Sequence, residues 1–437
     1  MLNIALALIA ALPAAAPEPL LLPDGEPVVA AYFFTRWWEP WRSDDDRVRA
    51  DIQILDEAGV NVLLIDHQPS QMFGEAGWSW FDRDHKLAAE RGLYIVPWLE
   101  SKCGRDASFA DRFDEIARRW DVQLERAEQQ DGTPAETLMW KPEFTTYMLR
   151  WIGDYLERYG EDSALLRVVR DGREYRVISP CVELGWGEVS FDDETNALFR
   201  EWVTKRYDDI DSLNAAWGTT YPDFDAIDPR DKEVFDYSDL RQPTQSPAVT
   251  DHTRFRTELV RDVYQGLADA LKAEYPDLLL MAELPYEFPC DHTDALKYGW
   301  EYAAFPEIAE WADLLLIRTT GDPSDASLVY MRDWAAERNI AIILTHRVAA
   351  GQGPTDEART FAEVRSYALD AANYASGFGY YSWNEMVDTH IAPNYPETTV
   401  PDVVAHWSVT MDESFWMTAR VARLNQAYRE ALRQLHE

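Results

Sequence analysis

Residues 28–35 read VVAAYFFT, residues 60–65 read VNVLLI and residues 93–99 read LYIVPWL. Each run is apolar and rich in β-branched or aromatic residues, which predicts a strand that is buried on both faces. Between the first two runs, residues 45–58 have the apolar spacing of an amphipathic helix, which ends before Gly59. This alternation of buried strand and helix predicts an α/β fold with a parallel sheet.

The same alternation continues to the end of the sequence. Five further apolar runs predict strands, at Val177–Leu184, Leu278–Glu283, Asp313–Arg318, Ile340–Thr345 and Gly377–Trp383. Further helices are expected at His85–Arg91, Ala107–Gln129, Pro142–Tyr159, Asp251–Glu274 and Ser414–Leu435. Eight buried runs joined by helices predict a closed (β/α)8 TIM barrel. An open doubly wound sheet would need a glycine-rich turn after its first strand, and the sequence has none.

Two long segments interrupt the alternation, at about residues 104–174 after the third strand and 190–250 after the fourth. We interpret both as helical insertions in a single catalytic barrel over residues 17–437. The first segment ends in a predicted hairpin that turns at Asp171-Gly172.

Residues 1–16 contain a short apolar run followed by small residues, which is typical of a signal peptide. We therefore expect a secreted or periplasmic protein. No other stretch approaches the roughly 20 apolar residues that are needed to cross a bilayer.

Charge and composition restrict the partners. The 437 residues include 78 Asp+Glu and 41 Lys+Arg, which gives a net charge of −37. Nucleic acids and anionic membranes both attract basic surfaces, so we expect neither as a partner. The 46% hydrophobic content and the 18 tryptophans predict a large core, with indole rings left for a ligand.

Metal and cofactor motifs are missing from the sequence. The three cysteines lack zinc spacing and the eight histidines are scattered. No phosphate-binding loop or serine-nucleophile elbow occurs. We therefore expect no metal and no cofactor.

Carboxylates and tryptophans collect at the predicted carboxyl ends of the strands, where TIM barrels carry their active sites. The candidate catalytic residues are Glu183, Glu283 and Glu385. The candidate substrate-binding residues are Trp37, Trp38, Asp66, His67, Trp98, Trp186, His346, Arg347, Trp383, Asn384 and Asp388. Two carboxyl groups can protonate a leaving oxygen and stabilise an oxocarbenium-like centre, while indole faces pack against sugar rings. These residues predict a glycoside hydrolase for a neutral oligosaccharide or polysaccharide.

The segment after Glu183 resembles the family 42 glycoside hydrolases, which are β-galactosidase-type enzymes of a retaining barrel clan. The resemblance lies in residues 199–219, FREWVTKRYDDIDSLNAAWGT. It implies that Glu183 is the general acid/base at the end of the fourth strand. This sequence departs from the family at Val182, where the family usually has Asn, and at the seventh strand. That strand ends in Thr345-His346-Arg347 without the family's nucleophilic Glu.

The two ends of the chain resemble family 99-like barrels. Residues 30–41, AAYFFTRWWEPW, are similar to the start of these barrels, and residues 382–388, SWNEMVD, to their eighth-strand motif. In family 99 endo-α-mannosidases the two Glu of that motif are catalytic. Glu385 matches the first, and Asp388 stands in place of the second. Both resemblances imply the same fold and reaction class, so we predict Glu183 as general acid/base, Glu385 as its partner and Glu283 as the alternative partner.

The same residues are compatible with two other functions. The missing seventh-strand Glu favours a non-catalytic carbohydrate-binding barrel, and a Glu or His base could serve a polysaccharide lyase. Family 42 enzymes are often trimers with further C-terminal domains, whereas this sequence ends soon after its eighth strand. We therefore expect those domains to be absent. The sequence defines neither the sugar, the linkage nor the oligomeric state.

Overall fold

The computed structural model describes most of the barrel but not every loop. The described residues are 16–36, 41–73, 77–99, 112–181, 184, 190–236, 246–284, 306–319, 325–346, 361–384 and 411–436. The predicted signal peptide, apart from Ala16, lies outside them.

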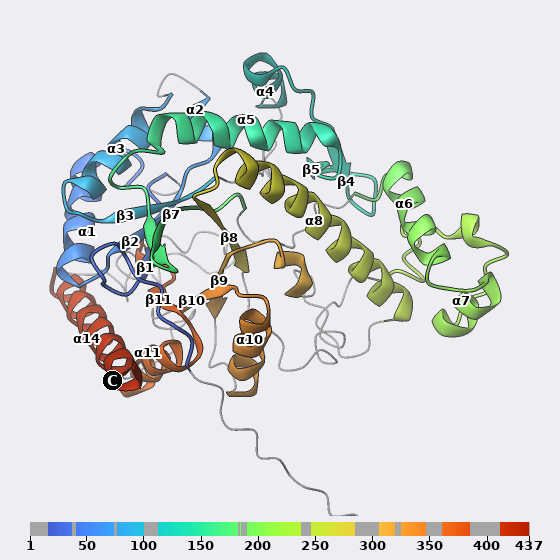
Figure 1. Cartoon of the computed structure of the whole chain (residues 1–437). Helices are drawn as coiled ribbons and strands as arrows, with labels where there is room; N and C mark the ends of the chain where they lie inside the picture. Colours follow the sequence, from blue (N-terminus) through green and yellow to red (C-terminus); the bar gives the residue numbers. More distant parts are fainter. Residues whose placement is uncertain are drawn as a thin grey trace, which may run out of the picture.

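Nine strands form one sheet in the order β3-β2-β1-β11-β10-β9-β8-β7-β6 (Figure 1). They are β1 (Val29–Tyr32), β2 (Val62–Asp66), β3 (Tyr94–Trp98), β6 (Arg167–Arg170), β7 (Arg173–Ile178), β8 (Leu278–Leu284), β9 (Leu314–Thr319), β10 (Ala341–His346) and β11 (Gly377–Tyr380). All neighbours pair in parallel except β6 and β7, which form the predicted hairpin. Its turn residues Asp171 and Gly172 have φ of 52° and 72°, as a tight hairpin turn requires.

The two edges of the parallel sheet meet just beyond β3 and β7. The backbone N–H of Leu99 donates to the carbonyl of Ser179 at 2.8 Å, and the N–H of Ser179 donates to the carbonyl of Pro97 at 3.0 Å. A parallel bridge pairs Trp98 with Ser179. The eight parallel strands therefore close into a barrel, and the TIM-barrel prediction is confirmed.

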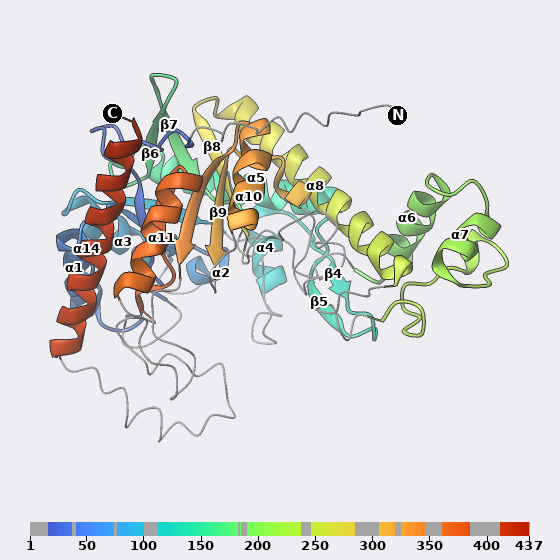
Figure 2. The same ribbon diagram turned by 90° about the horizontal axis from the view of Figure 1, so that it is seen from below.

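Helices cover the outside of the barrel (Figures 1 and 2). They include α1 (Asp45–Glu57), α2 (Pro69–Met72), α3 (Ser79–Ala89), α5 (Pro142–Tyr159), α8 (Pro247–Glu274), α10 (Asp325–Glu337), α11 (Phe361–Tyr374) and α14 (Met411–His436). In α1, the Asp44 side chain caps the free N–H groups of the first turn, and the predicted apolar face is buried. No helix within the described ranges is both long enough and apolar enough to span a membrane.

Two buried apolar clusters result from the alternation of side chains along each strand. The inner cluster fills the barrel and includes Tyr32, Trp98 and Met281. The outer cluster lies between the strands and the helices and includes Phe33 and Tyr380. Tyr32 and Phe33 are consecutive and point to opposite sides of the wall. The position of a residue in a strand thus decides whether it can reach the barrel interior.

The chain between β3 and β7 differs from the prediction. The helix expected over Ala107–Gln129 is only α4 (Arg112–Trp120) in the described residues, and it ends at Asp121, whose φ is 54°. The next residues form an antiparallel pair, β4 (Arg126–Glu128) with β5 (Pro134–Thr137). The prediction of a helix to Gln129 was therefore wrong, because a left-handed residue stops the helix and the following chain pairs as strands.

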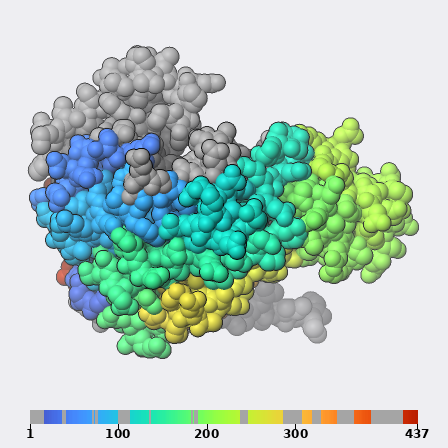
Figure 3. All heavy atoms as spheres, turned by 90° about the horizontal axis from the view of Figure 1, so that it is seen from above, coloured from blue at the N-terminus to red at the C-terminus, as the bar shows by residue number. Residues whose placement is uncertain are grey.

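The chain between β7 and β8 projects from one side of the barrel, beyond the amino-terminal end of α8 (Figures 1 and 3). It contains α6 (Asp193–Thr204), α7 (Ile210–Trp217) and a short 3-10 helix, η2 (Phe224–Ala226). The left-handed Gly218, with φ of 74°, ends α7. This projection contains the sequence on which the family 42 resemblance rests.

Candidate active site

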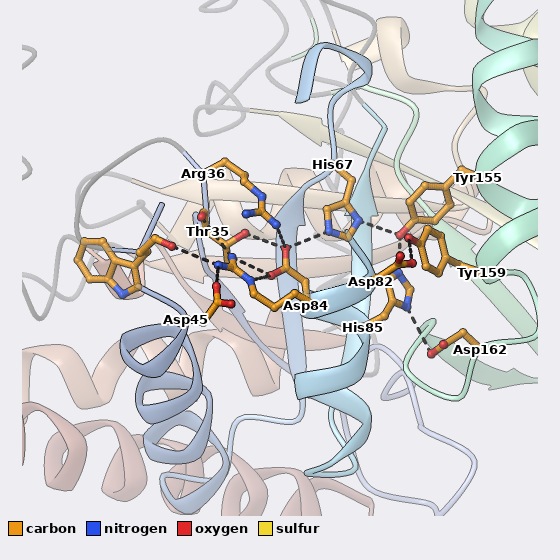
Figure 4. A network of polar contacts seen from close by, with 12 residues as sticks. Thr35, Arg36, Asp45, His67, Asp82, Asp84, His85, Tyr155, Tyr159 and Asp162 are labelled. Carbon is orange, nitrogen blue, oxygen red and sulfur yellow. Dashed lines mark hydrogen bonds and ion pairs between the residues drawn. The ribbon is translucent and has the colours of Figure 1, made fainter. Parts of the chain in front are cut away.

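A buried polar network lies beside the carboxyl ends of β1 and β2 (Figure 4). Its centre is Asp84 of α3, which is fully buried. The hydroxyl of Thr35 donates to Asp84 at 2.8 Å, and the guanidinium groups of Arg36 and Arg83 donate to it at 3.2 and 3.1 Å. Burial alone would raise the pKa of Asp84. The charges of Arg36 and Arg83, with a hydrogen bond from His67, outweigh burial and hold that pKa well below its usual range.

His67 extends the network toward α5. Its Nε2 lies 3.4 Å from Asp84, and its Nδ1 lies 2.8 Å from the hydroxyl of Tyr155. Burial lowers the pKa of His67 to about 4, so the imidazole is neutral near pH 7. Because an ionised carboxylate only accepts, we assign the proton to Nε2, which leaves Nδ1 to accept from Tyr155. His85 Nε2 lies 2.7 Å from the same hydroxyl, and His85 Nδ1 lies 3.3 Å from Asp162.

The network fixes the position of the chain that leaves β1. Arg36 is 2% exposed in its side chain and stacks on Trp80 at 4.4 Å from the ring centroid. Burial lowers the pKa of Arg36 to about 10, and the charges of Asp84 and Asp66 favour its cationic form. The segment that leads to Trp37 and Trp38 therefore begins from a residue held by a charged hydrogen bond and an aromatic face.

The second feature is a hydrogen bond across the inside of the barrel. The Tyr32 hydroxyl donates to Glu283 Oε1 at 3.0 Å. Tyr32 is on β1 and Glu283 is on β8, and in the sheet order these two strands lie opposite each other. Both side chains therefore point inward, and both are fully buried. The Tyr32 ring also contacts Trp98 and Tyr381, with centroids 4.7 and 4.8 Å away.

The structure separates the predicted site residues into three groups. On the inner wall lie Glu283, Trp98 and Asp66, and the last two are 1% exposed at the ends of β3 and β2. Trp98 contributes to the aromatic filling of the barrel rather than to an open surface. The backbone of His346 ends β10.

The second group lies outside the barrel interior. His67 directly follows inward-facing Asp66, so its ring turns to the helices and joins the Asp84 network. Trp383 belongs to the outer cluster. Asn384 is fully buried and bonds to the backbone of Phe34. The side chains of all three residues are enclosed by protein in this structure, and their predicted roles in substrate binding stay predictions.

The third group lies outside the described residues. It comprises Trp37, Trp38, Glu183, Trp186, Arg347, Glu385 and Asp388. Their predicted roles stay predictions. Among the residues that are described, no three His, Cys, Asp or Glu side chains gather in an arrangement that could hold a metal ion.

Of the residues in the network only His67 was predicted as a site residue, and Asp84 and Tyr155 are the two central members that were missed. Asp84 lies on the same helical face as Phe81 and Ala88, all three being buried. A charged residue on an otherwise apolar face signals a buried partner, and that pattern could have identified Asp84. Tyr155 gives no such signal, because it continues the aromatic face of Trp151 and Tyr159 on α5.

A closed TIM barrel with acidic and aromatic residues at its strand ends is the architecture that the sequence predicts for a glycoside hydrolase. Sequence comparison identifies the family. The family 42 glycoside hydrolase profile, described as β-galactosidase, matches residues 31–385. The chain therefore belongs to glycoside hydrolase family 42. The profile spans both ends of the barrel, and the resemblance of those ends to family 99 is not supported by it.

Individual relatives are distant and longer. A β-galactosidase from Haloferax lucentense is 24% identical over 222 residues, which are 46% of this chain and 29% of that protein. A β-galactosidase from Bifidobacterium bifidum is 25% identical over 252 residues, 53% of this chain and 32% of that protein. The structure of a catalytic mutant of a family 42 β-galactosidase from G. stearothermophilus superposes with a TM-score of 0.61 at 14% identity, covering 92% of this chain and 57% of that one. The matched part of this chain thus spans about a third of the curated relatives.

Proposed function

We propose that this protein hydrolyses glycosidic bonds of a neutral oligosaccharide or polysaccharide at the carboxyl end of its barrel. The observation that carries the proposal is the extent of the family match, residues 31–385. That range begins within β1, passes through the other seven parallel strands and ends at Glu385.

The proposed chemistry uses Glu183 as general acid/base. Glu183 follows β7, the fourth parallel strand, by five residues. A protonated Glu183 would donate its proton to the glycosidic oxygen as the bond to the anomeric carbon breaks. Glu385 is the proposed partner and follows β11, the eighth parallel strand, by five residues. As a carboxylate it would stabilise the oxocarbenium-like centre or take a proton from the attacking water.

Strand order bears on the stereochemistry. Around the closed barrel, three strands separate β7 from β11 in either direction, so the two strands lie opposite each other. β10, the seventh strand, has the sequence AIILTH and is followed by Arg347, so it offers no carboxylate as nucleophile. Carboxyl groups about 6.5–9.5 Å apart leave room for a water between one of them and the sugar, which gives inversion. Carboxyl groups about 5–5.5 Å apart instead give retention through a covalent intermediate, so the separation of the Glu183 and Glu385 carboxyl groups would decide the stereochemistry.

Turnover of a panel of aryl glycosides tests the proposed hydrolysis, and it includes an aryl β-galactoside because the named relatives are β-galactosidases. The expected product has the mass of the free sugar, since hydrolysis adds one water. A product lighter by that water would support the lyase instead. Binding of a sugar in calorimetry with no product from any substrate would support the carbohydrate-binding barrel, and either result would contradict the proposal.

The anomer of the first product tests the stereochemistry separately. Proton NMR of a running reaction shows whether the first product keeps or inverts the anomeric configuration of the substrate. Retention would indicate a carboxylate nucleophile and inversion a base-activated water, and either result leaves the hydrolase assignment intact.

A further inference from the structure

The side chain of Asn384 clamps the end of β1 to the end of β11. Its Oδ1 accepts from the backbone N–H of Phe34 at 2.7 Å, and its Nδ2 donates to the carbonyl of Phe34 at 3.1 Å. Asn384 is fully buried and Phe34 is 6% exposed. The clamp therefore satisfies both backbone polar groups of a residue that has just left the strand.

The next two residues are held from the opposite side of the wall. Asp84 accepts hydrogen bonds from the side chains of Thr35 and Arg36. Three consecutive residues, Phe34 to Arg36, are thus fixed by buried polar groups from two different elements. Exposed loops seldom receive such support, and here it is placed where a TIM barrel carries its active site.

On both sides of the clamp, the sequence continues directly into residues with a predicted function. On one side, Phe34 to Arg36 lead directly into Trp37 and Trp38, which are predicted sugar-binding residues. On the other side, Asn384 directly precedes Glu385, the proposed catalytic partner. A single amide therefore connects the two segments from which these residues extend.

We propose that Asn384 is a positioning residue for the reaction, because it fixes the end of β1 against the end of β11, and the sequence continues from these two strand ends to Trp37, Trp38 and Glu385. The proposal rests on the proposed function, because it needs Glu385 to act on a bound sugar. It replaces the predicted role of Asn384 in direct substrate binding, since its amide is occupied by Phe34.

The barrel contains a matched control for this clamp. Asn61, just before β2, accepts from the N–H of Val29 at 2.8 Å and donates to the carbonyl of Pro27 at 2.9 Å. Like Asn384 it makes one accepting and one donating side-chain to backbone hydrogen bond, here to Val29 at the start of β1 and to Pro27 just before the strand. In TIM barrels that amino-terminal face contributes to stability and not to chemistry.

The test compares the Asn384→Ala and Asn61→Ala variants. Both lose one amide and leave two backbone groups without that partner, so both should lose stability. Asn384→Ala should lower kcat by about 10²-fold, as expected for a misplaced catalytic group. Asn61→Ala should keep kcat within a few-fold of the wild type. Equal kcat losses in the two variants would overturn the positioning role.

A conservative variant supplies a second readout that remains useful if Asn384→Ala does not fold. The protonated side chain of Asn384→Asp has one donor and one acceptor, like the amide, whereas the ionised side chain only accepts. The ratio of its kcat to that of the wild type should therefore rise as the pH falls. A ratio that does not change with pH would contradict the role of the Phe34 carbonyl contact.

The two proposals fail in different ways. A wild-type protein that hydrolyses no glycoside refutes the proposed function, and if it still binds sugar, the two Ala variants are compared by dissociation constant instead. Equal dissociation constants would then overturn the clamp as well. If the wild type is active and the two Ala variants have similar kcat values, only the positioning role of Asn384 is refuted.

Discussion

The buried imidazole of His67 should make the fold sensitive to mild acid. Its pKa is lowered to about 4 by burial, whereas an unfolded histidine titrates near 6.5. Between these values the unfolded chain binds a proton that the folded protein does not. The free energy of unfolding therefore falls as the pH falls from about 6.5 to about 4.

The size of the effect follows from the two pKa values. At pH 7 the His67 contribution to the pH dependence is close to zero, and at pH 5 it amounts to about 2 kcal/mol of lost stability. At pH 4 the loss reaches about 3 kcal/mol, which is a large share of the stability of a typical domain. The lowered pKa of Asp84 protects the network in this range, because Asp84 stays ionised and keeps its hydrogen bonds.

The assay is urea unfolding followed by tryptophan fluorescence at pH 7, 6 and 5, for the wild type and for His67→Gln. The variant should be less stable at pH 7, because it loses contacts to Tyr155 and Asp84. Its stability should however fall by about 2 kcal/mol less than that of the wild type between pH 7 and pH 5. His436→Gln, at the exposed end of α14, controls for loss of a histidine as such. Parallel pH profiles for the wild type and His67→Gln would refute the reasoning.

Three further predictions concern the same interior and the surface charge. Asp84→Ala should cost about 3–5 kcal/mol in denaturant unfolding, because it removes the salt-bridge partner of the buried Arg36 guanidinium. Asp82→Asn, on the same helix as Asp84, breaks a half-exposed pair with Arg158 and should cost less than about 1 kcal/mol. Equal costs would contradict the central place of Asp84. Tyr32→Phe should lose about 1–3 kcal/mol, because it removes a donor from the buried Glu283, while Tyr428→Phe should be near neutral, because the Tyr428 hydroxyl has no hydrogen-bond partner in the described structure. With a net charge of −37, added NaCl should raise the melting temperature by screening self-repulsion, and a lower melting temperature would contradict this.

The barrel was predictable because its signals are local. Strands buried on both faces are continuous apolar runs, and all eight runs form strands of the barrel. The turn at Asp171-Gly172 is likewise carried by its own residues. The prediction of a helix to Gln129 was wrong, because residues 126–128 pair with residues 134–137. The sequence of these short segments has no helix-like or strand-like pattern that would predict the pairing.

The site was less predictable because each orientation depends on strand register. Asp66 and His67 both follow the apolar run of β2, and only the observed strand shows that the first faces the barrel and the second faces α3 and α5. A shift of one residue reverses such an assignment. The role of Asn384 depends on Phe34, which is 350 residues away in the chain. No pattern near Asn384 shows that its amide bonds to β1.

The central claim is that this family 42 barrel hydrolyses glycosides with Glu183 as the general acid. The activity of Glu183→Gln tests that claim most directly. The variant is compared with the wild type and with Glu201→Gln, which changes an exposed glutamate on α6. For a substrate with an alcohol leaving group, Glu183→Gln should lower kcat/KM by about 10²–10⁴-fold, because the leaving oxygen then departs without a proton. The loss should be much smaller for an aryl glycoside with an acidic phenol, and Glu201→Gln should match the wild type on both. Full activity of Glu183→Gln on the alcohol glycoside would contradict the account.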